Sequence, residues 1–393
     1  MDLEGLTGKL LGQGRSGAVF LEYDAEGNPF VRKVFHGSLI TNVIHYLSSG
    51  APNPYMWNEN AINSAYYRRK ILSDLVEYWF NGELRIAKSL GVDWSEDSSA
   101  HVLEAEYIRG SHAALHTPFS KKKEGELSDL VVNIMKPLQQ RLQESGFDGL
   151  LWQAGKGNPV ATNNFLLEKS PDGNSSWIWI DLESGVPPLI PLHLPSFLFY
   201  IKKSTQYGSV LFDDVDTNKL KIYVKNNESN LKQKIGNDRY AGMLENIRKL
   251  EEHQKKWKSI SRAESGITYQ LKKGKITEKQ AEWYARHVAL WYSKEIAKLP
   301  WKAYDKITGD LMWNGLNNAA LALYQAWYAK AWKYVYRQKY REEAARNYLA
   351  GRINEWEKRK QLVQEQAVDL HRKLESGESA SYVTDFGVHL AVQ

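Results

Sequence analysis

The stretch GNPVATNNFLLEKSPDGNSSWIWIDLESG (residues 157–185) contains two short β-prone runs, NFLLE and SWIWIDLE, joined by the turn-rich KSPDGNSS. This pattern predicts a β-hairpin with Asn164 at the start of one strand and Asp181 at the end of the other. Amide and carboxylate oxygens delivered to one end of a hairpin are ligands that suit Mg²⁺. A carboxylate that ends the apolar run WIWI also needs a cation nearby. We therefore expect Asn164 and Asp181 to bind a metal, with a turn-capping aspartate as the alternative.

Upstream, residues 6–35 alternate like strands broken by glycines, which predicts three antiparallel strands. They contain GQGRSGAV (residues 12–19), a match to G-x-G-x-x-G-x-V. A dinucleotide-binding fingerprint of the same spelling opens into a helix, whereas the residues that follow here are β-prone. The pattern favours a hairpin folded over phosphates, because glycines let backbone N–H groups approach phosphate oxygens. The residues concerned are Gly12, Gly14, Gly17 and Val19, and an ordinary glycine-rich hairpin is the alternative.

Lys33 lies sixteen residues after Gly17, on the next expected strand. There its ammonium group can reach under the glycine hairpin and hold α- and β-phosphates. Arg32 is one residue away and would point to the opposite face of the strand. The alternative is a surface lysine on an edge strand. Residues 58–90 then carry apolar side chains at three- and four-residue spacings, which predicts a helix.

The ordered set of GQGRSGAV, Lys33, the hinge-like strand HVLEAEYIRG, Asn164 in NNFLL and Asp181 in WIDLES resembles the protein kinase-like superfamily over residues 6–200. It is more similar to the lipopolysaccharide, aminoglycoside and atypical bacterial kinases than to eukaryotic protein kinases, since IDLES stands where IDFG would. The resemblance implies an ATP- and Mg²⁺-dependent phosphotransferase. The acceptor, whether small molecule, lipid or protein, stays open.

By the same resemblance, each motif residue has an implied role. Gly12 to Gly17 and Val19 would cover the nucleotide phosphates, Lys33 would pair with them, and Asn164 and Asp181 would hold magnesium. Glu106 and Tyr107 would lie at the adenine hinge. A glutamate on the helix should pair with Lys33, and Glu77 fits the expected distance from the hinge best. Glu83 and Glu59 remain alternatives.

One expected residue is missing. The family places a catalytic-loop aspartate five residues before the asparagine, and that position holds Pro159. Proline cannot accept a proton, so activity should be lower but need not vanish, since phosphoryl transfer depends mostly on positioning and charge. The nearest acids are Asp148 and Glu183.

Two side chains in WQAGKGNP could compensate. Gln153 and Asn158 could orient an acceptor by hydrogen bonds, and Lys156 could steady the transferred phosphate. The alternative is that QAGKGNP is a turn that replaces an inactive catalytic loop. The protein would then be a pseudokinase, a nucleotide-binding or nucleotide-free scaffold whose helical extension binds a protein partner or a membrane surface.

Composition limits the remaining possibilities. The 393 residues include no cysteine, which excludes disulfides, thiolate metal sites and cysteine nucleophiles. The N-terminus lacks the pattern of a secretory signal, and no apolar stretch approaches the roughly 20 residues that span a bilayer. We expect a cytoplasmic protein with, at most, peripheral membrane contact.

The expected fold is α+β, a two-lobe protein kinase-like fold with an all-helical C-terminal extension. Its regions are an N-lobe (1–110), a C-lobe (111–235) and a basic, aromatic extension (236–393). The extension could pack as a bundle on the core, lie on an anionic membrane, or bind nucleic acid. Acids on its positive face argue against nucleic acid. The bundle interpretation depends on an apolar stripe of Leu316, Ala320, Leu323, Trp327, Ala331, Tyr334 and Val335.

Overall fold

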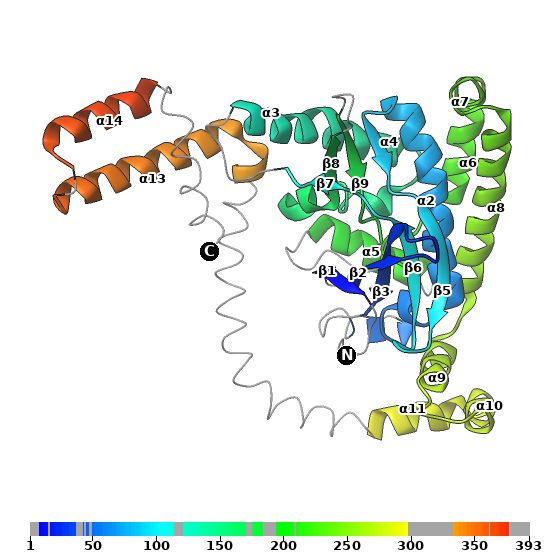
Figure 1. Ribbon diagram of the computed structural model, residues 1–393. Helices are drawn as coiled ribbons and strands as arrows, with labels where there is room; N and C mark the ends of the chain where they lie inside the picture. The colour runs from blue at the N-terminus through cyan, green and yellow to red at the C-terminus, as the bar shows by residue number, and fades with distance from the viewer. Residues whose placement is uncertain are drawn as a thin grey trace.

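The computed structural model has an α+β fold, with a β-rich N-terminal lobe and a helical C-terminal part (Figure 1). It describes residues 8–14, 16–36, 42, 45–46, 49–113, 121–169, 175–183, 194–207, 210–297, 333–360 and 362–376. Five strands form the N-terminal sheet in the order β1-β2-β3-β6-β5. Their bounds are β1 Lys9–Gln13, β2 Gly17–Tyr23, β3 Pro29–Phe35, β5 Ser89–Ser95 and β6 Ala100–Glu106. The three antiparallel strands expected over residues 6–35 are β1 to β3.

A second sheet has the order β4-β9-β8-β7. Its strands are β4 Leu84–Ile86, β7 Gly110–Ser111, β8 Phe165–Lys169 and β9 Ser175–Trp179. β8 and β9 form the expected antiparallel hairpin, and β4 pairs with β9 in parallel. Phe165 lies opposite Trp179 in the hairpin. The residues just before β8 and just after β9 therefore meet at one end of the second sheet.

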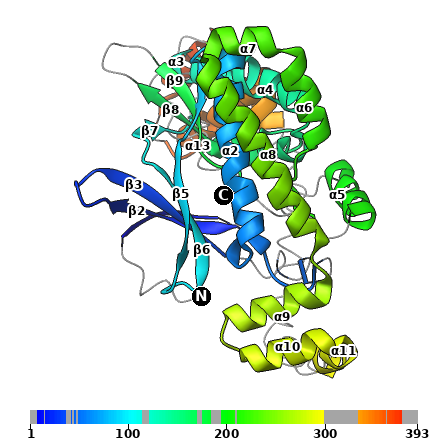
Figure 2. The same ribbon diagram turned by 90° about the vertical axis from the view of Figure 1, so that its right-hand side faces the viewer.

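Helix α2 (Glu59–Phe80) connects the two sheets in sequence and runs beside α8 (Asn237–Ser259) in both views (Figures 1 and 2). Asn58 caps its N-terminus, where the side chain accepts a hydrogen bond from the Ala61 N–H at 3.0 Å. The helix ends ten residues before the sequence pattern predicted, at Phe80 instead of position 90. It ends because Asn81 takes a left-handed conformation with φ of 51° and Gly82 follows with φ of +94°.

A helical segment of three parts leads to the second hairpin. It consists of α3 (Lys121–Asp129), the π-helix η2 (Leu130–Met135) and α4 (Lys136–Glu144). Pro137 lies in the first turn of α4, directly after the π-helix. A proline ring would clash with the carbonyl four residues earlier in a regular α-helix, and the wider π-turn relieves that clash.

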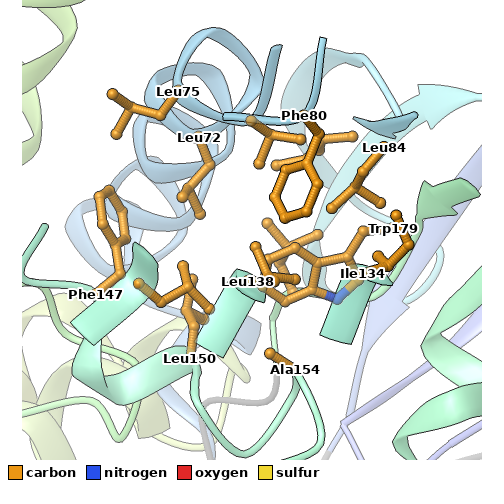
Figure 3. Packing of buried hydrophobic residues seen from close by; sticks show 14 of the residues in the cluster. Leu72, Leu75, Phe80, Leu84, Ile134, Leu138, Phe147, Leu150, Ala154 and Trp179 are labelled. Carbon is orange, nitrogen blue, oxygen red and sulfur yellow. The ribbon is translucent and has the colours of Figure 1, made fainter. Parts of the chain in front are cut away.

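The main hydrophobic core lies between α2, η2, α4 and the second sheet (Figure 3). Leu72 and Phe80 of α2 face Leu138 and Ile134, with Trp179 of β9 alongside. Four buried residues of α8 belong to the same core, namely Tyr240, Met243, Ile247 and Leu250. A second cluster joins the first half of α2 to the N-terminal sheet through Phe35 and Leu103. Helix α2 thus packs on both sheets.

A buried ion pair ties α2 to the segment before α6 (Thr217–Asn226). The Arg68 guanidinium lies 3.0 Å from the Asp213 carboxylate, and both side chains are fully buried. The Tyr55 hydroxyl, in the short helix η1 (Pro54–Met56), donates to the same carboxylate at 2.6 Å. Breaking one partner of such a pair would leave a buried charge, which costs about 3–5 kcal/mol.

The chain after residue 193 is helical in the part that the structure describes. Besides α6 and α8 it forms α5 (Leu194–Tyr207), α7 (Glu228–Ile235), α9 (Arg262–Lys272), α10 (Glu278–Arg286), α11 (Val288–Ala297), α13 (Gln338–Lys358) and α14 (Gln364–Ser376). The stripe positions 316–331 lie outside the described residues, whereas Val335 is buried in the main core. None of the described helices has the length and apolar character needed to cross a membrane.

Candidate active site

The glycine hairpin connects β1 to β2, and its turn is closed by a 2.8 Å hydrogen bond from the Gly14 N–H to the Gly17 carbonyl. A β-carbon at Gly17 would lie 2.7 Å from the Val34 carbonyl oxygen, so the packing of β2 on β3 requires this glycine. Among the described residues, a β-carbon at Gly12 would meet nothing within 4 Å, and one at Gly14 would meet only the Gly17 carbonyl oxygen, at 3.8 Å. Intramolecular packing therefore explains Gly17 but not Gly12 or Gly14.

Lys33 lies on β3, opposite Val19 of the hairpin strand β2. Its ammonium donates to the Asp181 carboxylate at 2.7 Å and to the Glu183 carbonyl oxygen at 3.1 Å. The Lys33 side chain is only 12% exposed, whereas that of Asp181 is 39% exposed. A lysine of the N-terminal sheet and an aspartate of the second sheet thus meet, 148 residues apart in the chain.

Asn164 and Asp181 lie at the same end of the β8–β9 hairpin, as the sequence predicted. The Ile180 N–H donates to the Asn164 carbonyl oxygen at 2.9 Å, and Asp181 follows directly. The Asn164 side-chain amide donates to the backbone oxygen of Gln153 at 2.9 Å and to its side-chain oxygen at 3.2 Å. These bonds turn the Asn164 Oδ1 away from Gln153. An amide and a carboxylate oxygen supply two of the six ligands of Mg²⁺, which commonly completes its shell with water and phosphate oxygens.

Gln153 and Asn158, expected to orient an acceptor, lie in the turn before η4 (Pro159–Asn164) and are buried. The Gln153 side-chain oxygen is used to hold Asn164. The Asn158 amide donates to the Trp152 carbonyl at 3.3 Å, and its own oxygen has no partner among the described residues. Lys156, in the same turn, is exposed.

A tyrosine from the C-terminal extension closes this turn. The Tyr336 hydroxyl donates to the Gly155 carbonyl at 2.7 Å and lies 3.4 Å from that of Asn158. Gly155 has φ of +95°, and a β-carbon there would lie 2.8 Å from the tyrosine oxygen. The extension therefore contacts the turn that holds the amide of Asn164.

The expected pairing of Glu77 with Lys33 is not what the structure has. The Glu77 carboxylate pairs with Arg239 of α8 at 2.8 Å and is 41% exposed. The α2 residue at the site is Arg69, eight residues and therefore about 12 Å earlier along the helix axis. Of the alternatives, Glu59 lies in the first turn of α2 and Glu83 follows the helix end.

Glu183 takes the place between Lys33 and α2. Its carboxylate is fully buried, accepts two 2.9 Å hydrogen bonds from the Arg69 guanidinium and lies 3.6 Å from the Lys33 ammonium. Burial alone would raise the pKa of Glu183, but the charges of Arg69 and Lys33 and the bonds from Arg69 outweigh it and hold that pKa at about 2. The glutamate is therefore ionised at neutral pH. A sequence signal existed, since Ala65, Arg69 and Leu72 share one face of α2 and both apolar residues are buried.

Both acids nearest to the missing base position, Asp148 and Glu183, pair with a cationic side chain. Glu183 is held as described, and Asp148 lies 3.8 Å from Lys219 of α6. The position five residues before Asn164 is the first residue of η4. Among the described residues, no group of three or more histidines, aspartates and glutamates could hold a metal ion.

Glu106 and Tyr107, the residues expected at the hinge, lie where the chain passes from the N-terminal sheet to the second sheet. β6 ends at Glu106, and residues 107–109, which include Tyr107, lead to β7. The Glu106 carboxylate pairs with Arg85 and accepts the Lys88 N–H at 2.7 Å, so this side chain holds the start of the connection.

Comparisons with known proteins give distant likenesses. No protein-family model and no curated protein sequence matches the chain. Among solved structures, the kinase domain of maize SIRK1 (sucrose-induced receptor kinase 1) bound to AMP-PNP is similar with 11% identity and a TM-score of 0.26, over 69% of this chain and 92% of that one. Rio2 kinase from Chaetomium thermophilum, in an ADP/Mg²⁺-phosphoaspartate complex, is similar with 12% identity and a TM-score of 0.24, over 67% and 70%. Cex1p is similar with 14% identity and a TM-score of 0.23, over 73% and 49%.

Proposed function

We propose that this protein binds ATP with Mg²⁺ at this site and transfers the terminal phosphoryl group to an acceptor, as an atypical kinase-like phosphotransferase. The observation that carries the proposal is the contact of Lys33 with Asp181 beside Asn164. An ammonium group and two hard oxygen ligands are the parts that a magnesium-bound polyphosphate needs. The free space at Gly12 and Gly14 supports a ligand that approaches the hairpin backbone.

The residues would act by positioning and charge. Asn164 and Asp181 would hold Mg²⁺, which when bound neutralises negative charge on the phosphates. Lys33 would exchange its contact with Asp181 for contacts with the phosphate oxygens. The N–H groups of the glycine hairpin would close over the phosphates. Gln153 would keep the Asn164 amide oriented toward the metal.

A second candidate is a pseudokinase that binds nucleotide without efficient transfer. It is favoured by the contacts of the two nearest acids, because Asp148 faces Lys219 and Glu183 is held by Arg69. Glu183 is fully buried with both carboxylate oxygens bonded to Arg69, which leaves it poorly placed to take a proton from an acceptor hydroxyl. The partner would then be a protein or a membrane surface contacted through the helical extension.

The first experiment is a thermal shift with ATP, with and without Mg²⁺, on the wild type and Asp181→Asn. Asp97→Asn serves as the matched control, since Asp97 lies in an exposed turn. We expect a magnesium-dependent stabilisation in the wild type and the control that is lost in Asp181→Asn. No shift in any of the three at millimolar ATP would contradict the proposal.

Turnover separates the two candidates. Release or transfer of radiolabelled phosphate from γ-labelled ATP, absent in Asp181→Asn, would support the phosphotransferase. Magnesium-dependent binding without any turnover would support the pseudokinase.

A further inference from the structure

We propose that Glu183, held by Arg69, is the residue that positions Lys33 for phosphate binding. The carboxylate that the kinase-like resemblance implied on helix α2 is thereby assigned to the segment after β9. The role in phosphate binding rests on the proposed function, whereas the positioning of the lysine can be tested without nucleotide.

Arg69 is built to hold Glu183 in one place. Its guanidinium donates to both carboxylate oxygens of Glu183 at 2.9 Å, a two-bond contact that fixes the orientation of the carboxylate. Two further N–H groups donate to the carbonyl oxygens of Ala87 and Ile180, both at 2.9 Å. The guanidinium thus joins α2, the segment after β4 and the segment after β9 at a single point.

Lys33 makes two kinds of contact with this segment. Asp181, its 2.7 Å partner, is partly exposed and lies at the metal end of the hairpin. Glu183 is fully buried and offers its backbone oxygen at 3.1 Å and its carboxylate at 3.6 Å. If Asp181 turns to a metal, the contacts with Glu183 remain. The ammonium then stays beside the site with its charge balanced.

The charges of the site also favour Glu183 as the residue that positions Lys33. Two cations, Lys33 and Arg69, face two carboxylates, Asp181 and Glu183, in a largely buried group. Glu183 is the member that contacts both cations, so neutralising it would leave two positive side chains facing each other across a neutral group. Lys33 would then lose its fixed position, and α2 would lose its link to the lysine.

The test uses Glu183→Gln, which keeps the size of the side chain and removes its charge, and Arg69→Lys as a milder change. The matched control is Asp74→Asn. Asp74 lies on α2, like Arg69, and the change removes its ion pair with Arg239 of α8. The first readout is the rate at which N-hydroxysuccinimide acetate acetylates Lys33 in the nucleotide-free protein, followed by mass spectrometry. We expect several-fold faster modification in Glu183→Gln, an intermediate rate in Arg69→Lys and no change in the control.

The second readout compares the affinities for MgATP and for adenosine, which has no phosphate to contact Lys33. We expect Glu183→Gln to bind MgATP about tenfold more weakly, which corresponds to about 1.4 kcal/mol, with adenosine affinity unchanged. A purely structural role would weaken both ligands together and would overturn the proposal, as would an unchanged rate of Lys33 modification. Faster modification in a protein whose wild type binds no MgATP would support the positioning of Lys33 by Glu183 and reject the proposed function.

Discussion

Replacing Glu183 by glutamine should lower the free energy of unfolding by an amount that depends on pH. The carboxylate is fully buried, and its pKa falls from an ordinary 4.5 to about 2 in the folded protein. At about 1.4 kcal/mol per pH unit, this difference corresponds to about 3 kcal/mol of stability at pH 7. Glutamine resembles the protonated carboxyl group, so the variant should lose about this much.

The direction of the pH dependence follows from the lowered pKa. A group whose pKa is lower in the folded state stabilises the protein above its unfolded pKa, and the stabilisation is lost as pH falls through the folded pKa. The contribution of Glu183 is therefore complete above about pH 5 and declines between pH 4.5 and pH 2. At pH 3 the same relation leaves somewhat less than half of this stabilisation.

Urea unfolding of wild type and Glu183→Gln at pH 7 and pH 3, followed by tryptophan fluorescence, measures this difference. Glu77→Gln is the control, because Glu77 pairs with Arg239 at the surface, where an ion pair contributes about 1 kcal/mol or less. The difference for Glu183→Gln should shrink by about half between the two pH values. A difference that is equal at pH 7 and pH 3, or absent at pH 7, would refute the argument that Arg69 and Lys33 keep this carboxylate ionised.

Three further predictions concern the surroundings of the site. Gly17→Ala should lower the free energy of unfolding, measured by chemical denaturation, by about 1–3 kcal/mol, because the added β-carbon would press on a carbonyl of β3. Gly12→Ala should leave stability unchanged and weaken MgATP binding, measured by calorimetry. Tyr336→Phe should lower the free energy of unfolding by about 1 kcal/mol through the lost hydrogen bond and reduce the magnesium-dependent thermal shift. An unchanged shift would mean that the extension does not support the end of the hairpin where Asn164 and Asp181 lie. Glu77→Gln should leave the affinity for MgATP unchanged, and a marked loss would restore the pairing of Glu77 with Lys33.

The parts of the site that follow local patterns could be predicted from the sequence. The β1–β2 hairpin, Lys33 on β3 and the strands that bring Asn164 and Asp181 together all depend on alternation, glycines and short spacings. Such patterns determine on which strand, and at which end of it, a side chain lies. The roles of these residues in binding nucleotide and metal remain predictions.

The partner of Lys33 could not be predicted in the same way. The choice of Glu77 rested on distance along the chain, whereas the contact depends on how α2 packs against the second sheet. Arg69 and Glu183 are 114 residues apart, and nothing in either local sequence connects them. The position of Arg69 on the apolar face of α2 indicated a buried charge, which must have a partner, but not which carboxylate supplies it.

The hydrogen bond of Tyr336 has a consequence for the order in which the protein matures during synthesis. Tyr336 follows Gly155 by 181 residues. A ribosome adds about 5–20 residues per second, and N-terminal regions fold first, so the turn is made about 10–35 s before its closing tyrosine exists. During that interval the turn that carries Gln153, the hydrogen-bond partner of Asn164, lacks its bond to Tyr336. A nascent chain should therefore complete its sheets well before it completes the end of the hairpin where Asn164 and Asp181 meet.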